Sequence, residues 1–246
     1  MAKFAIYYIP PADSLLYQRG SEILGYDIRA CQSLPVDNPT RRALGEFHSD
    51  WVEMCQYYGF HVTTAGTYEY DPSTLAWDAV IETVADILDV LDPHTPMELL
   101  ASPNLIWGES FVGLRYMPNQ SFQTLHTLLC AMLPKYGILS RPMRKLQQDP
   151  QAFGSAHHLA HRTARYFTPY IYDNFVPHFT LLNPFVSANP APIFEACQTL
   201  FAEFSVVAVQ SICLVNLTDD APWYQIVHEF HCEQYPRPYA VDLPTK

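Results

Sequence analysis

The sequence predicts an α+β fold built from two similar lobes. Helical and strand-like patterns alternate along the chain, and the order of helix, His-x-Thr strand, helix and strands occurs twice. Hydrophobic residues make up 49% of the 246 residues, enough to bury a substantial apolar interior. No low-complexity stretch or linker divides the chain, so we expect residues 1–246 to form a single bilobal domain.

The first half is predicted to begin with a strand that alternates in polarity and ends at two prolines. Asp13 and Gly25 are the expected caps of the helix that follows. A longer helix, with apolar residues every three or four positions, is expected to end at Gly59, before a second strand and a third helix. In chain order these elements are residues 3–9, 14–24, 41–58, 60–67 and 71–92.

The second half is predicted to open with two strands and a helix whose apolar side chains form one stripe. Residues 137–169 follow no clear pattern apart from one helical segment. A strand, a helix that starts near Pro190 and two strands closing a hairpin around Asp219 complete the chain. In chain order these elements are residues 97–102, 111–116, 121–133, 155–167, 177–183, 190–204, 205–217 and 223–232.

The chain is acidic, with 14 Lys and Arg against 25 Asp and Glu and a formal net charge of −11. Such a surface repels polyanions, which argues against long nucleic acid or an anionic membrane as partner. A small phosphoester in a locally positive pocket remains compatible with this charge. The six cysteines include no Cys-x-x-Cys pair, so we expect reduced core thiols.

The first residues lack the apolar stretch and cleavage site of a signal peptide, and no run of about 18 apolar residues occurs. We therefore expect a cytoplasmic protein with no membrane partner. The sequence leaves the oligomeric state open, and a monomer is assumed.

Two triplets of the form His-x-Thr lie on predicted strands, His61-Val62-Thr63 in the first half and His178-Phe179-Thr180 in the second. Side chains alternate across a strand, so the histidine and threonine of each triplet point to one face. Two such strands meeting across a cleft would surround one anion with two imidazoles and two hydroxyls. A single such triplet also arises by chance on half-buried strands.

This set of groups suits cleavage of a phosphodiester. A neutral imidazole takes a proton from water or a sugar hydroxyl, and a protonated one donates to the leaving oxygen. The threonine hydroxyls can hydrogen-bond the non-bridging oxygens as charge builds on them. His61 and His178 are thus candidate catalytic residues, and Thr63 and Thr180 candidate substrate-binding residues.

Further side chains could contact the substrate. Arg141 and Arg144 could supply a guanidinium to the phosphate, although a solvated pair on a loop is the commoner arrangement. Tyr7 and Tyr172 could stack on a base or sugar, although most such aromatics pack in a core. His157 and His161 share a helix face and could ligate zinc, but no third ligand is evident, so we expect no metal and no cofactor.

The triplets and their surroundings resemble the two-histidine (2H, LigT-like) phosphoesterase superfamily, which carries two His-φ-Thr/Ser motifs with φ apolar. The segments around the two triplets, 58–63 and 175–181, and the stretches 4–11 and 24–27 are similar to a branch linked to phosphonate metabolism. The chain departs from that branch at Thr64, where leucine is usual. It also has Val176 and Pro177 where a basic residue and an aromatic are common.

The resemblance implies a bilobal, pseudo-symmetric α+β fold with two antiparallel sheets lining a central cleft and helices outside. It implies metal-independent hydrolysis of a small phosphoester, such as a 2′,3′-cyclic nucleotide or cyclic sugar phosphate, with His61 as acid and His178 as base. Two alternatives stay open: a protein that binds a nucleotide or phosphosugar without cleaving it, and a metal-dependent hydrolase at residues 157–161.

Overall fold

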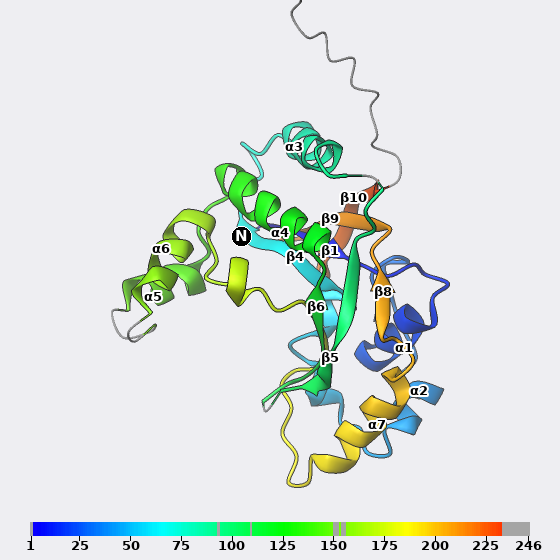
Figure 1. Ribbon diagram of the computed structural model, residues 1–246. Coiled ribbons are helices and arrows are strands. Elements are labelled where there is room, and N and C mark those ends of the chain that lie inside the picture. The colour runs from blue at the N-terminus through cyan, green and yellow to red at the C-terminus, as the bar shows by residue number, and fades with distance from the viewer. Residues whose placement is uncertain (1, 93, 109, 150–152, 154–155, 233–246) are drawn as a thin grey trace, which may run out of the picture.

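The computed structural model describes residues 2–92, 94–108, 110–149, 153 and 156–232 and combines helices with a curled antiparallel sheet (Figure 1). The strands are β1 (Lys3–Tyr8), β2 (Tyr26–Asp27), β3 (Gln32–Ser33), β4 (Val62–Glu69), β5 (Glu98–Trp107), β6 (Val112–Pro118), β7 (His178–Leu182), β8 (Val206–Ala208), β9 (Ser211–Leu217) and β10 (Gln225–His231). The helices are α1 (Leu15–Leu24), α2 (Pro39–Ala43), α3 (Trp77–Asp89), α4 (Gln120–Met132), α5 (Arg141–Gln148), α6 (His157–Tyr166) and α7 (Ala191–Phe201). The predicted α+β class is confirmed.

Eight strands form one sheet in the order β10-β9-β1-β4-β7-β6-β5-β8, and β2 pairs with β3 alone. We expected two antiparallel sheets lining a cleft, and the eight main strands instead form one continuous sheet. Two four-stranded halves join between β4 and β7, where Val62 and Phe179 are the register partners. Next to this join, the rings of Phe60 and Phe179 stack with centroids 4.5 Å apart.

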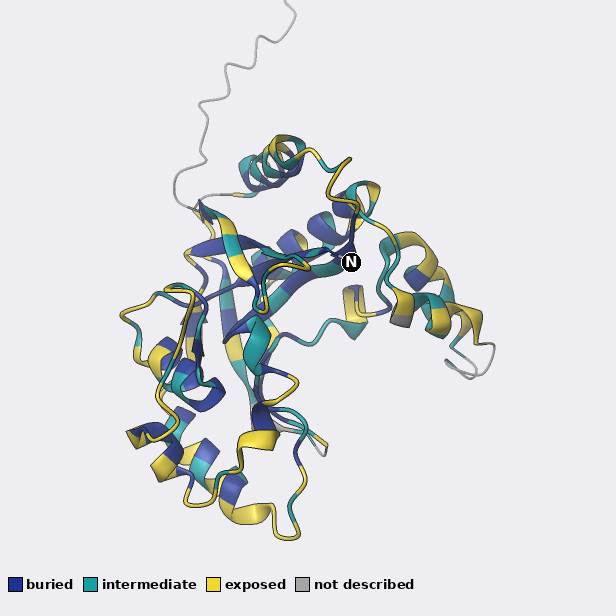
Figure 2. Cartoon of the chain, turned by 180° about the vertical axis from the view of Figure 1, so that it is seen from behind, coloured by how far each residue is buried: buried dark blue, intermediate teal, exposed yellow. Residues whose placement is uncertain are grey.

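Helices cover both faces of the sheet. Helix α4 contacts β4, β5 and β6, with α3 and α6 beside it, while α1 contacts β7 and α7 contacts β5 (Figure 1). Helix α1 approaches the sheet closely because Gly20 has no side chain; a Cβ there would lie 2.2 Å from the Phe60 ring. Figure 2 shows the buried residues along the strands and the inner sides of these helices, whereas α5 and α6 are largely exposed.

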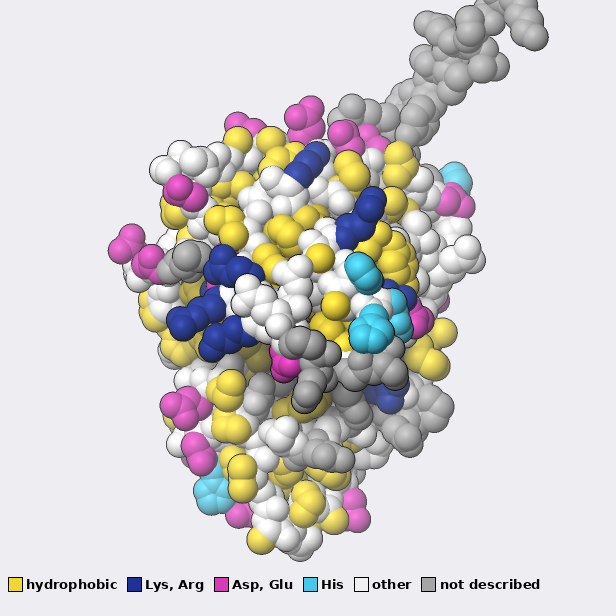
Figure 3. All heavy atoms as spheres, turned by 90° about the vertical axis from the view of Figure 1, so that its left-hand side faces the viewer, with side chains coloured by type: hydrophobic (Ala, Val, Ile, Leu, Met, Phe, Trp, Pro, Cys, Tyr) yellow, Lys and Arg dark blue, Asp and Glu magenta, His cyan; other side chains and the backbone are white. Residues whose placement is uncertain are grey.

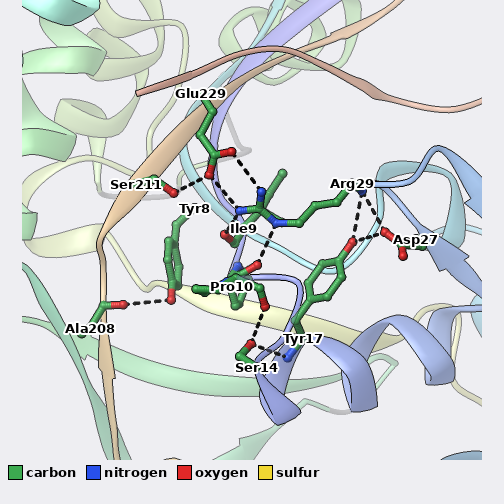
Figure 4. Close-up of polar contacts among 11 residues, drawn as sticks. Tyr8, Ile9, Pro10, Ser14, Tyr17, Asp27, Arg29, Ala208, Ser211 and Glu229 are labelled. Carbon is green, nitrogen blue, oxygen red and sulfur yellow. Dashed lines mark hydrogen bonds and ion pairs between the residues drawn. The ribbon is translucent and has the colours of Figure 1, made fainter. Parts of the chain in front are cut away.

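An ion pair fixes the end of β1 to the sheet edge (Figure 4). The Arg29 guanidinium donates to both oxygens of Glu229 on β10, at 3.0 and 3.1 Å, and to the carbonyls of Ile9 and Pro10, at 2.8 and 2.9 Å. The Ser211 hydroxyl of β9 donates to the same carboxylate at 2.6 Å. These contacts connect the turn between β2 and β3 with three strands.

The predicted helix over 41–58 is wrong. Helix α2 ends at Ala43, and Gly45 has a φ of +78°, which ends the helical path. The rest consists of two 3-10 turns, Ser49–Val52 and Gln56–Tyr58. Backbone bonds to the end of β7 explain these turns, since Asn183 N donates to Trp51 O at 2.5 Å and Met54 N donates to Asn183 O at 2.9 Å.

Three other predictions need correction, and one helix was missed. The predicted strand over 205–217 is two strands, β8 and β9, which lie in opposite halves of the sheet. Helix α3 begins at Trp77, because Asp71 accepts from Ser73 N and forms a turn. The N-cap of α1 is Ser14, which accepts from Tyr17 N, in place of Asp13. Helix α5 was not predicted.

All six cysteines are free thiols; four are buried, Cys232 is half-buried and Cys31 is exposed, so the expectation of core thiols fails for Cys31. Within the described ranges, no helix has the length and apolar character needed to cross a bilayer.

Candidate active site

The two triplets lie side by side at the join of the sheet. Val62 and Phe179 are antiparallel partners, so His61 lies across from Thr180 and Thr63 across from His178. Directly opposed residues in such a ladder have Cα atoms about 4.5–5.5 Å apart. The central residues Val62 and Phe179 are fully buried, and all four polar side chains line one cavity.

Each imidazole is oriented by the backbone carbonyl two residues before it. Nδ1 of His61 lies 2.9 Å from Gly59 O, and Nδ1 of His178 lies 2.8 Å from Val176 O. A carbonyl oxygen only accepts, so Nδ1 carries a proton in both rings. In the neutral rings Nε2 is therefore the basic nitrogen, and in His61 it accepts from the Thr63 hydroxyl at 3.1 Å.

Burial keeps both imidazoles neutral near pH 7. It is the main cause that lowers the pKa of His61 to about 3; the hydrogen bond to Gly59 opposes this shift and the adjacent His178 adds to it. Burial likewise lowers the pKa of His178, against the hydrogen bond to Val176. A bound anion would raise both pKa values, because it stabilises the charged imidazolium.

The cavity has a volume of about 960 Å³, which is far larger than a phosphate group needs and large enough for a ligand the size of a nucleotide. Two tyrosines contact His61: Tyr7 stacks on its ring with centroids 3.5 Å apart, and Tyr58 meets it edge-on at 5.2 Å. Tyr57 and Tyr224 line the same wall. Burial raises the pKa of all four hydroxyls, so they remain neutral donors.

Three of the predicted binding residues lie outside the cavity. The Arg144 guanidinium lies 3.6 Å from the Glu69 carboxylate, and the backbone N–H of Arg141 donates to the same carboxylate at 3.3 Å. The Tyr172 hydroxyl donates to the Tyr166 hydroxyl at 3.0 Å, and the Tyr172 ring lies against Arg162. Tyr7, by contrast, lines the cavity, although the histidine ring already covers one of its faces.

A third histidine, His126 of α4, lines the cavity and was not predicted. Its Nδ1 donates to Thr64 O at 2.7 Å, and its ring stacks on Phe175 with centroids 3.5 Å apart. Burial lowers its pKa to about 4. His126 thus connects the strand of the first triplet to the segment before the second. A histidine on the buried stripe of α4, between Leu125 and Leu129, was the available signal.

The departures from the family pattern lie at this same place. Thr64 is fully buried, and its hydroxyl has no hydrogen-bond partner among the described residues. Val176 contributes the carbonyl that orients His178. The backbone carbonyl of Val176 thus orients a triplet histidine, and that of Thr64 orients His126.

The described parts of the chain hold no group of three or more His, Cys, Asp or Glu side chains arranged to bind a metal ion. His157 and His161 are exposed on α6. No family model matches the chain, and its sequence matches no curated protein.

Proposed function

We propose that the protein is a metal-independent phosphodiesterase or cyclic phosphodiesterase that cleaves a small phosphoester by two-histidine acid–base catalysis. The observation that carries the proposal is the register of β4 and β7. It brings two imidazoles and two hydroxyls, each imidazole with its Nδ1 bonded to a carbonyl, to one wall of a nucleotide-sized cavity.

In this proposal the phosphate sits between the two triplets. Nε2 of one neutral histidine takes a proton from the attacking water, and the other histidine, protonated at Nε2, donates to the leaving oxygen. The hydroxyls of Thr63 and Thr180 donate to the non-bridging oxygens. Following the resemblance, His61 is the acid and His178 the base. Because burial lowers the pKa of His61, the negative charge of the bound substrate must supply the drive for its protonation.

The proposal also covers the compartment in which the protein acts and the type of molecule that it binds. The substrate is a small molecule and the protein acts in the cytoplasm, where its free thiols would remain reduced. Long nucleic acid is disfavoured by the net charge of −11.

The test is turnover of 2′,3′-cyclic nucleotides and cyclic sugar phosphates in the presence of EDTA. We expect His61→Ala and His178→Ala each to lower kcat by about 10²–10⁴-fold, the usual contribution of a general acid or base. His94→Ala, at an exposed loop position, is the matched control and should retain wild-type turnover. Turnover that survives both active-site substitutions would overturn the proposal.

The same assay separates catalysis from simple binding. Saturable binding of a nucleotide with no product after long incubation would replace the phosphodiesterase by a protein that only recognises the phosphoester.

A further inference from the structure

His126 of α4 is a polar residue at a position that packs in the core. It is 3% exposed and lies on the buried stripe of α4 beside Leu125 and Leu129. The histidines of α6, by contrast, are exposed, and Figure 3, viewed from the side of α5 and α6, shows a group of histidine side chains on that surface. Burying a polar ring is unfavourable unless its hydrogen bonds are made, so the partners of His126 indicate its role.

The first partner of His126 is the carbonyl of a bulge in β4. The register between β1 and β4 shifts directly after Thr63, and Thr64 is the extra residue at this point. A bulge takes its residue out of the regular ladder, and a buried carbonyl without a partner is costly. Nδ1 of His126 donates to the Thr64 carbonyl at 2.7 Å. The imidazole therefore stabilises the bulge next to Thr63, whose hydroxyl bonds to Nε2 of His61.

The second partner of His126 belongs to the segment before the second triplet. The Phe175 ring stacks on the imidazole with centroids 3.5 Å apart and an angle of 5° between the ring planes. The next residue, Val176, supplies the carbonyl that accepts from Nδ1 of His178. The Cys130 thiol, one turn further along α4, lies 3.7 and 3.9 Å from the two ring nitrogens of His126. These contacts fix the orientation of the imidazole between the two triplets.

We infer that His126 is a positioning residue, which holds the two triplets at the separation that the reaction needs. The inference rests on the proposed function, in which both triplets act on one phosphate. A short path connects each triplet to the same imidazole, one through the Thr64 carbonyl and one through the Phe175 ring. Helix α4 contacts β4, β5 and β6, so the imidazole is carried by a well-supported element. Misplacing a catalytic group by about 1 Å can cost about 10²-fold in rate.

The test removes the two contacts of the imidazole separately, with a 2′,3′-cyclic nucleotide as substrate. His126→Asn keeps an N–H donor near the place of Nδ1 and loses the ring, whereas His126→Phe keeps a ring and loses the donor. We expect His126→Phe to lower kcat by about 10–100-fold with KM within about twofold of wild type, and His126→Asn to recover part of this loss. The pH profile of kcat/KM in His126→Phe should keep both of its limbs, because a positioning residue transfers no proton.

Two variants are matched controls. Leu129→Ala removes a fully buried side chain of the same helix and should lower stability without the loss of kcat, at temperatures where it remains folded. His161→Phe makes the same substitution at an exposed histidine of α6 and should keep the wild-type kcat. An equal loss of kcat in Leu129→Ala and His126→Phe would reduce His126 to core packing and overturn the inference. Equal kcat in the two His126 variants overturns it too, and so does the loss of one limb of the pH profile.

A measurement without turnover separates this inference from the proposed function. If the wild type cleaves no phosphoester, the phosphodiesterase fails, and the NMR signals of the Cε1 protons of His61 and His178 decide the positioning. Shifts of both signals in His126→Phe that are partly reversed in His126→Asn and absent in His161→Phe support it, and unchanged signals in His126→Phe overturn it. If neither His126 variant folds, Phe175→Leu removes the ring stack alone; a lowered kcat supports the inference, and an unchanged kcat overturns it.

Discussion

At the scale of single residues, the two histidines have the same hydrogen-bonding and burial pattern. Each donates from Nδ1 to the carbonyl two positions earlier, and each is buried enough that its pKa lies below the ordinary value of 6.5. The form of the pair that can work as acid and base has one of the two rings protonated on Nε2 as well as on Nδ1. At pH 7 neither Nε2 of the empty site is protonated, because both pKa values are lowered, so falling pH increases the productive form until the second Nε2 is protonated too.

This protonation behaviour predicts the pH dependence of the proposed reaction. We expect kcat/KM, which reports the free enzyme, to rise as pH falls from 8 and to reach its optimum below pH 6.5, between the lowered pKa values of His178 and His61. The optimum of kcat should lie at higher pH, because the bound anion raises both values. Rates measured from pH 4 to 9, with the fold checked at each pH, test this. A kcat/KM optimum above pH 7.5 contradicts it.

At the scale of elements, the Arg29–Glu229 pair connects the turn between β2 and β3 to β1, β9 and β10. Burial alone would raise the pKa of Glu229, but the hydrogen bonds from Arg29 and Ser211 outweigh it, and the pKa lies below 4.5. A carboxylate with a lowered pKa contributes stability above its unfolded pKa, and this contribution is lost as pH falls through the folded value.

We therefore expect Glu229→Gln to lower the free energy of unfolding by about 1–3 kcal/mol at pH 7, because it leaves a half-buried guanidinium without its charged partner. The difference from wild type should shrink as pH falls from 5 to 3. Urea unfolding of both proteins at pH 5 and at pH 3 measures this difference in the free energy of unfolding. Glu203→Gln is the control: its pair with Arg19 is largely exposed on the Glu203 side, so about 0.5 kcal/mol or less is expected. A pH-independent difference at Glu229 would contradict the ion-pair account.

At the scale of the whole molecule, the site depends on how the two halves of the sheet meet. The fully buried ring of Phe179 stacks on Phe60 and packs edge-on against Tyr8 in the first half and Tyr116 in the second. His178 and Thr180 flank this ring on the opposite face of β7. The packing beneath the sheet therefore sets the spacing of the triplets above it.

We expect Phe179→Ala to lower the free energy of unfolding by about 3–5 kcal/mol, the usual cost of removing a buried phenyl ring. It should also reduce kcat/KM by at least tenfold at temperatures where the variant remains folded, because the triplets lose their common support. Phe201→Ala, which removes an equally buried ring of α7 outside the cavity, is the control. If both variants lose equal stability and equal activity, the junction has no special role in positioning the triplets.

The sequence by itself determined the α+β class, most of the strands and the two polar triplets, because period-two and period-3.6 patterns and a His-x-Thr spacing are local properties. It also pointed to the orientation of each triplet, since alternation along a strand needs no knowledge of the partner strand. Asn183, by contrast, bonds to Trp51 and Met54 across more than 120 positions, and this distant contact turns an apparent helix over 41–58 into short turns.

Only the tertiary structure decided that β4 and β7 are neighbours and that β8 and β9 lie in opposite halves of the sheet. It also decided that Lys3, His126 and Tyr224 line the same cavity as the histidines. It also showed that Arg141, Arg144 and Tyr172 contact other residues and lie outside the cavity of the triplets. The physical reason is that strand pairing and side-chain packing join residues far apart in the chain, and no local pattern encodes which of the possible partners buries the most surface.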